Sequence, residues 1–254
     1  MTYRDITFNE RNRIKRYLQN RRLDDALGVL DRAGLEECRT ILDFGAGDGQ
    51  LCRRIQTRFS GKTTYCYEPS PRLAEEAEDV LRSVTNAPIV TSLDALGGLH
   101  FDCIFCLGVL EHLPEERLGP TLELLWDLLV PDGVCILEVP NEIFLPALVR
   151  GLFRMTRRYG EFDARLCNIL RASVGRPPRQ RPLGEIGPGL PYHFHHLGFD
   201  DRRLTPRLRE HFAIVDRFGS PWSFLGPRLN FEIYYLLRKV PAATDLRPQA
   251  TRAA

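Results

Sequence analysis

The sequence predicts an α/β protein built on a Rossmann-like, doubly wound sheet of seven mostly parallel strands with an antiparallel last strand. N-terminal helices precede this core and an inserted cap interrupts it. Short apolar segments alternate with helical segments between residues 40 and 141, as in a parallel sheet covered on both faces. A glycine-rich turn joins the first of these segments to a helix. The last two apolar segments follow each other without room for a crossover helix, so they are expected to be antiparallel.

The N-terminal part is predicted to be helical. Residues 8–34 carry apolar side chains at helical spacing, from Ile14 to Leu30. Gly34 is a natural helix end, because glycine tolerates the left-handed conformation found there. Residues 1–39 are therefore assigned as an N-terminal helical segment.

The core follows as an alternation of strands and helices. Strands are expected at 40–44, 63–68, 88–92, 101–110 and 133–140, and helices at 50–59, 69–84 and 114–130. Residues 40–141 are assigned as the cofactor-binding core. A helix at 200–212 and strands at 213–219 and 230–239 complete the sheet within residues 200–240, and the tail 241–254 is expected to be disordered.

An insertion at 142–199 breaks the alternation and is predicted to be a cap that covers a ligand bound at the end of the sheet. It is rich in proline and glycine, and it carries nine arginines between Arg150 and Arg181 against only Glu161 and Asp163. Three interpretations remain open. The arginines face water, they bind an anionic acceptor, or they rest on an anionic membrane beside a lipid-like acceptor.

Composition excludes several classes of protein. A net charge of +2 argues against a broad basic surface for nucleic acid. The N-terminus lacks the apolar core of a secretory signal, and no apolar stretch is long enough for a spanning helix. Seven cysteines show neither zinc-finger nor disulfide spacing, so a reducing, cytoplasmic location is expected.

The strongest functional signal is the loop of Gly45, Ala46, Gly47 and Gly49 after the first strand. Glycines let the backbone approach a ligand closely. The G-x-G-x-G spacing is one residue tighter than a dinucleotide fingerprint. Asp43, two residues before Gly45, adds a carboxylate that suits the ammonium and sulfonium of S-adenosylmethionine better than a pyrophosphate.

A second signal is Glu68, which ends the second strand 19 residues beyond Gly49. An acid at this position can accept hydrogen bonds from both hydroxyls of a ribose. Together with the glycine loop, Glu68 predicts a site for an adenosine-containing cofactor.

Three segments resemble class I S-adenosylmethionine-dependent methyltransferases: ILDFGAGDG, the acid Glu68, and FDCIFCLGVLEHLP. The nearest similarity is to the subgroup with the ubiquinone-biosynthesis O-methyltransferases and many small-molecule and sugar methyltransferases. The resemblance covers residues 40–141 well and 200–240 loosely. It implies S-adenosylmethionine as the cofactor.

The resemblance also implies roles for single residues. Asp43, Gly45 and Gly47 would hold the methionine end of the cofactor, Glu68 the ribose, Pro69 and Ser92–Leu93 the adenine, and Leu107 and Gly108 the sulfonium side. Relatives carry an Asp near the adenine edge, whereas this chain has Asp94 two residues after Ser92.

Histidines are the candidate proton acceptors. His112 follows Glu111 just past the fourth strand, where the relatives also carry Glu-His, and its ordinary pKa lies near neutrality. The alternative is that it only caps or packs the next helix. His195 and His196 lie in a segment that forms part of the lid in similar methyltransferases, which implies acid–base or substrate-binding roles. The alternative for them is a surface or packing role.

No metal is expected. The spacing of His193 and His195 is compatible with a metal, but no carboxylate pattern nearby completes a site. Catechol-type methyltransferases hold magnesium with carboxylates after the fourth and fifth strands, where this chain has Cys106–Leu107 and Pro140–Asn141.

The expected function is methylation of a small-molecule, sugar or lipid-like acceptor by direct in-line displacement. Oxygen is the favoured acceptor atom, with nitrogen and carbon left open. Two other functions remain as alternatives: a non-catalytic S-adenosylmethionine-binding protein, and a nicotinamide-dependent oxidoreductase, which the glycine spacing and the antiparallel strand pair disfavour.

Overall fold

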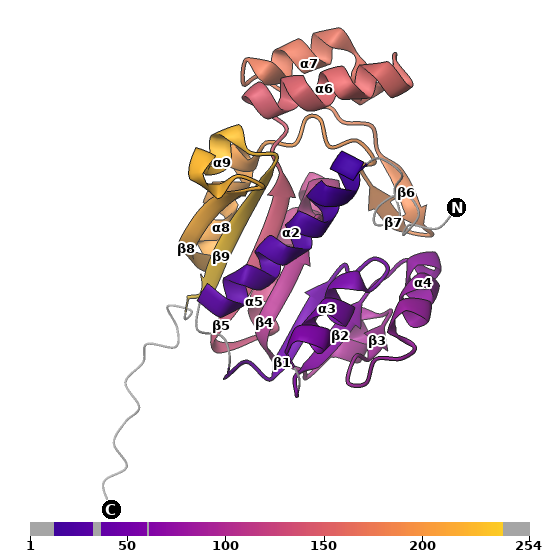
Figure 1. Cartoon of the computed structure of the whole chain (residues 1–254), viewed down its shortest axis with the longest axis vertical. Coiled ribbons are helices and arrows are strands. Elements are labelled where there is room, and N and C mark those ends of the chain that lie inside the picture. The colour runs from indigo at the N-terminus through magenta and orange to yellow at the C-terminus, as the bar shows by residue number, and fades with distance from the viewer. Residues whose placement is uncertain (1–12, 33–36, 60, 241–254) are drawn as a thin grey trace, which may run out of the picture.

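A computed structural model describes residues 13–32, 37–59 and 61–240, and its centre is a seven-stranded sheet of order β3-β2-β1-β4-β5-β9-β8 (Figure 1). The strands are β1 (Thr40–Phe44), β2 (Thr63–Tyr67), β3 (Ile89–Val90), β4 (Phe101–Leu107), β5 (Leu129–Pro140), β8 (Phe212–Ser220) and β9 (Glu232–Lys239). Each predicted strand is present, but β3 is shorter than expected, β4 ends at Leu107, and β5 begins at Leu129, inside the segment predicted as a helix at 114–130.

The strand directions confirm the predicted mixed sheet. Strands β1 to β5 are mutually parallel, and β9 is antiparallel to both β5 and β8. The last strand therefore lies between β5 and β8, and β8 forms the edge of the sheet. The connection from β8 to β9 holds only the short helix α9 (Gly226–Leu229) and a single 3₁₀ turn, too little chain for a crossover.

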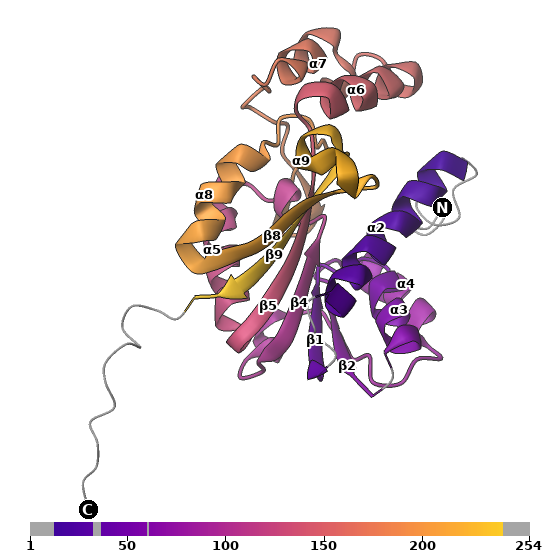
Figure 2. The same ribbon diagram turned by 60° about the vertical axis from the view of Figure 1, so that its left-hand side comes forward.

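Helices cover both faces of the sheet, as Figure 2 shows. One face carries α2 (Arg13–Arg32), α3 (Gln50–Arg58) and α4 (Pro71–Leu81), and the other carries α5 (Glu115–Asp127) and α8 (Asp201–His211). Each helix turns an apolar stripe towards the strands. Leu27 and Ile55 pack into the first core, and Leu125 and Leu208 into the second.

The insertion contains more regular structure than the sequence predicted. It forms α6 (Phe144–Arg158), α7 (Leu166–Ser173) and a hairpin of β6 (Gly184–Gly187) and β7 (Leu190–Tyr192). The helices α6 and α7 lie beyond the end of the sheet at which β5 finishes (Figure 1). They pack closely because a Cβ on Gly151 would meet the side chain of Ile169 at 2.6 Å.

Short 3₁₀ turns complete the chain: η2 (Leu93–Leu96), η3 (Leu110–His112), η4 (Phe162–Ala164) and η5 (Ser223–Leu225). The predictions for residues 1–12, the helix end at Gly34 and the tail 241–254 lie outside the described residues. Among the helices of the described part, none has the length and apolar character needed to cross a membrane.

Strand order fixes where a ligand can bind. Strand β1 has β2 on one side and β4 on the other, so the chain changes winding direction at the β1–β4 boundary. In open α/β sheets, ligands bind at the carboxyl ends of the strands beside such a switch point. The loops after β1, β2 and β4 meet there.

Candidate cofactor and acceptor site

The glycine loop after β1 adopts a backbone that requires glycine. Gly45, Gly47 and Gly49 have φ values of 76°, 59° and 74°, in the left-handed region that side chains disfavour. The amides of Gly45 and Ala46 both donate to the carbonyl of Tyr67 at 2.9 Å, which fastens the loop to β2. A Cβ on Gly45 would meet Val109 Cγ2 at 2.5 Å, so the loop also closes against the end of β4.

Glu68 is joined directly to this loop. One carboxylate oxygen accepts from the amide of Gly47 at 2.9 Å, and the other accepts from the amide of Ser70 at 2.9 Å. Burial raises the pKa of Glu68, and the two amide donors oppose that shift. The side chain is thus held in one orientation at the end of β2, beside the half-buried Pro69.

Asp43 lies under the loop, between β1 and α3. Its carboxylate accepts from the thiol of Cys52 at 3.5 Å, and the side chain is almost fully buried. Burial raises the pKa of Asp43 to about 7. A neighbouring cation would favour the charged form.

The residues that follow β3 contribute fewer polar groups to the candidate site than those that follow β1 and β2. Ser92 accepts a hydrogen bond from the amide of Asp94 at 3.2 Å and so caps η2, while Leu93 is exposed. Both residues follow β3 at the same edge of the sheet as Glu68.

Arg22, in α2, is a residue that the sequence reasoning missed. Its guanidinium donates to Glu138 of β5 at 2.7 Å and lies against Gly108, where it leaves no room for a Cβ. Gly108 has a φ of 67° and follows Leu107 at the end of β4. No local pattern marks this arginine, because its partner is far away in sequence.

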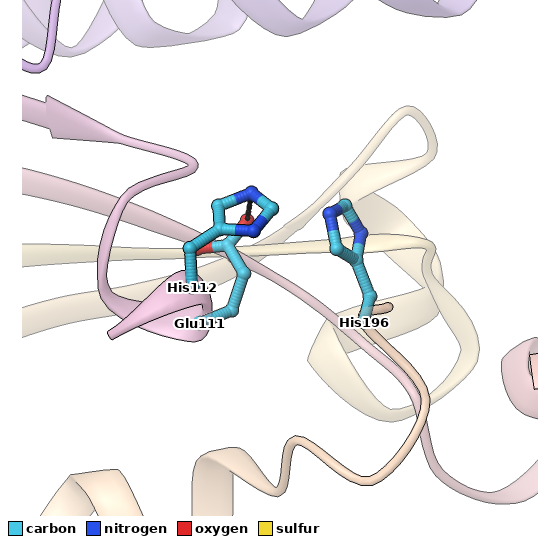
Figure 3. A group of neighbouring side chains, drawn as sticks. All are labelled: Glu111, His112 and His196. Carbon is cyan, nitrogen blue, oxygen red and sulfur yellow. Dashed lines mark ion pairs between the residues drawn. The ribbon is translucent and has the colours of Figure 1, made fainter. Parts of the chain in front are cut away.

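Glu111, His112 and His196 gather just past the end of β4 (Figure 3). The carbonyl of His193 lies 2.7 Å from Nδ1 of His112, which places the ring proton on that nitrogen. Nε2 lies 3.7 Å from a carboxylate oxygen of Glu111. The His112 ring stacks on Tyr192 at 4.2 Å between centroids and meets the His196 ring edge-on at 4.7 Å.

Burial sets the charge of this cluster. It lowers the pKa of His112 to about 4 and that of His196 well below its ordinary value, and the guanidinium of Arg181 adds to both shifts. Burial also raises the pKa of Glu111 to about 7. Both imidazoles are therefore neutral at pH 7, and the Nε2 of His112 carries a lone pair.

His195 is not part of this group. Its Nδ1 lies 3.2 Å from Asp163 in the α6–α7 connection, and its ring lies near Phe162. The structure thus brings two of the three predicted histidines together. Arg181 holds their loops in place by donating to the carbonyls of Glu111 and His195.

Two groups of side chains have spacing compatible with a metal ion, a feature that the sequence reasoning did not anticipate. The ligand atoms of Glu111, His112 and His196 lie within 4.8 Å of one another, as do those of Glu161, Asp163 and His195. Asp163 is already paired with Arg158 at 2.7 Å. The first group contains a single carboxylate.

The strand order, the glycine loop and the acid after β2 together define a Rossmann-like methyltransferase fold. The family described as "Methyltransferase domain" matches residues 11–173, well over half of the chain, and the chain belongs to this family. No curated protein matches the chain significantly in sequence.

Solved structures show the same fold at low sequence identity. Magnesium protoporphyrin IX methyltransferase from Synechocystis PCC 6803, with bound S-adenosylhomocysteine, aligns with a TM-score of 0.60 and 16% identity, over 91% of this chain and 89% of that one. The 1,6-didemethyltoxoflavin-N1-methyltransferase of Burkholderia thailandensis gives 0.53 and 19%, over 86% and 78%. Mitomycin 7-O-methyltransferase gives 0.54 and 14%, over 90% and 59%.

Proposed function

We propose that the chain is an S-adenosylmethionine-dependent methyltransferase that methylates an oxygen of a small-molecule acceptor. The observation that carries this proposal is the hydrogen bond between Glu68 and the glycine loop, at the same edge of the sheet at which the neutral His112–His196 pair lies past the end of β4. The similar structures include a complex with S-adenosylhomocysteine, an N1-methyltransferase and a 7-O-methyltransferase, which supports methyl transfer from S-adenosylmethionine to a small molecule.

The residues present fit the cofactor. Glu68 offers two oriented carboxylate oxygens for the ribose hydroxyls, and Pro69 and Ser92–Leu93, which follow β2 and β3, would contact the adenine. The turn from Gly45 to Gly49 has the bare backbone that the methionine portion needs, with Asp43 beneath it. Leu107 and Gly108 would face the sulfonium, and the guanidinium of Arg22, which lies against Gly108, would have to move aside for this cation.

When bound, S-adenosylmethionine supplies an electrophilic methyl group that passes to the acceptor in one displacement. The protein positions the acceptor, and positioning contributes about 7–11 kcal/mol when the geometry is right. His112 takes the hydroxyl proton on Nε2, because Nδ1 already donates to the carbonyl of His193. The carboxylate of Glu111 then stabilises the imidazolium.

Calorimetry tests this proposal. The purified protein should bind S-adenosylmethionine and S-adenosylhomocysteine with micromolar affinity, and neither NAD nor NADP. Glu68→Ala should weaken cofactor binding by roughly 2–3 kcal/mol, because a charged acceptor to two hydroxyls is lost. Glu75→Ala, on the exposed side of α4, is the matched control and should leave affinity unchanged. Tighter binding of a nicotinamide cofactor would contradict the proposal.

A further inference from the structure

Helix α6 has apolar side chains on both of its faces. Ala147 and Gly151 face the protein and are buried. On the opposite side, Leu145, Val149, Leu152 and Phe153 are 45–52% exposed. At about 100° per residue these four positions form one continuous stripe along the helix.

Helix α7 repeats the arrangement. Ile169 and Ala172 are buried against α6, while Leu166, Leu170 and Val174 are 48%, 49% and 67% exposed. The two helices form a layer at the end of the molecule, away from the sheet (Figures 1 and 2). Clustered exposed apolar side chains of this kind mark an interaction surface.

Arginines border this layer. An open cavity of about 1030 Å³ adjoins α7, and its basic lining residues are Arg165, Arg171, Arg176, Arg179, Arg202 and Arg203. Its one carboxylate, Asp200, is already paired with Arg202 at 2.7 Å. Within the described part of the chain, Arg171, Arg176 and Arg179 form no ion pair with a carboxylate.

The cavity therefore combines positive charge with several guanidinium donors, which suit phosphate groups. A guanidinium offers paired donors to phosphate oxygens. Arg150 and Arg154 differ, because they are buried against Glu142 and serve the interior of the cap. The structure thus separates the surface arginines from the structural ones.

We propose that the α6–α7 layer docks on an anionic phospholipid membrane. The exposed leucines, Val149 and Phe153 enter the boundary between headgroups and acyl chains, and the cavity arginines bind headgroup phosphates. A second copy of the chain fits less well, because a two-fold contact uses the same patch on both copies and would bring two positively charged surfaces together. This proposal does not depend on methyl transfer.

Vesicle co-sedimentation of the full chain tests this docking. The protein should bind vesicles containing about one-third phosphatidylglycerol and not pure phosphatidylcholine, and binding should weaken severalfold in high salt. The double variant Leu152→Ser, Phe153→Ser and the triple variant Arg171→Gln, Arg176→Gln, Arg179→Gln should each reduce binding by about tenfold. The three substituted positions on α7 and its following loop and the two on α6 are exposed, so folding should be retained, which circular dichroism checks.

Matched exposed positions elsewhere provide the controls. Val215→Ser on β8 and Arg209→Gln on α8 should leave vesicle binding unchanged. Failure to bind phosphatidylglycerol vesicles, or equal loss in the control variants, would overturn the proposal. A dimer in light scattering that the Leu152→Ser, Phe153→Ser variant dissociates, without vesicle binding, would assign the layer to self-association instead.

Discussion

At the scale of single residues, the candidate site contains buried carboxylic acids that are only partly ionised at neutral pH. Asp43 has a pKa of about 7 because burial penalises its carboxylate. A cationic ligand beside it would restore the charge, and binding would then draw a proton from the protein. The strength of cofactor binding should therefore depend on pH.

The first prediction concerns this dependence. Between pH 6 and pH 7.5 the affinity for S-adenosylmethionine should rise about eightfold, since the ionised fraction of a group with a pKa near 7 rises by that factor. Calorimetry at a series of pH values measures it. Asp43→Asn should bind more weakly and show a nearly flat profile; a variant that keeps the full rise would assign the titration to another group.

The second prediction concerns the proton acceptor. His112→Ala should lower turnover by about 10²–10⁴-fold with little change in cofactor affinity, because a general base contributes that much. At saturating cofactor, His112 itself should not titrate between pH 8 and pH 6, since its pKa is about 4, so a fall in turnover towards pH 6 would report protonation of Glu111, whose pKa is about 7. The exposed His100 provides a control, His100→Ala. Full activity of His112→Ala would show that His112 is not the general base.

The same cluster is expected to work without a metal. Glu111 is its one carboxylate, and the guanidinium groups of Arg22 and Arg181 place positive charge near His112, which opposes a divalent cation. Turnover should survive EDTA treatment. Loss of activity that manganese or magnesium restores would assign Glu111, His112 and His196 to a metal instead.

The candidate cofactor site could be located from the sequence more fully than the acceptor site. The glycine loop and Glu68 each follow a strand, and adjacent parallel strands bring their carboxyl ends together. The meeting of His112 with His196 and Tyr192 depends on how the insertion folds back, and the contact of Arg22 with Glu138 depends on how α2 crosses the sheet. Neither contact leaves a local pattern.

At the scale of elements, α6 is fastened to the core by buried ion pairs. Glu142, after β5, pairs with Arg150 and Arg154, and Arg150 also reaches Glu232 of β9. The guanidinium partners lower the pKa of Glu142 in spite of its burial. The arginines of the insertion thus fall into two classes, those buried in ion pairs and those exposed at the surface. The sequence could not separate them, because α6 carries apolar residues on both of its faces.

The third prediction follows from this anchoring. Arg154→Gln should reduce the free energy of unfolding by about 3 kcal/mol, because Glu142 and Asp163 lose a partner in a buried site. Arg157→Gln, on the exposed side of the same helix, should change stability by less than about 0.5 kcal/mol. Urea denaturation measures both. Equal stability of the two variants would contradict a structural role for the buried pairs.

At the scale of the whole molecule, the sheet order determines which loops meet. The alternation of segments and the short β8–β9 connection were sufficient to predict a mostly parallel sheet with an antiparallel last strand. The position of β9 between β5 and β8 was not predictable in the same way, because it results from packing between segments distant in sequence. The pair of helices in the insertion was missed for a different reason. Its buried face includes small residues such as Ala147 and Gly151, which give a weak apolar pattern in the sequence.

The last prediction concerns the stability of the cofactor-free protein above neutral pH. Burial raises the pKa of Asp43 and Glu111 to about 7, that of Asp48 to about 6 and that of Glu232 to about 8. Acids with raised pKa values bind more protons in the folded state than in the unfolded state, so stability falls as pH rises. The lowered pKa of His112 acts in the opposite direction, but only below its unfolded value near 6.5.

The acids therefore dominate from pH 6.5 to pH 8.5, and the free energy of unfolding should fall by about 2 kcal/mol per pH unit near pH 7. Saturating S-adenosylmethionine should flatten this slope, because a cation beside Asp43 lowers its pKa in the complex. Urea unfolding at several pH values, with and without the cofactor, measures both slopes. Asp43→Asn should reduce the slope of the free protein and remove most of the effect of the cofactor on it. Stability that increases over this range would show that the buried acids are ionised in the free protein.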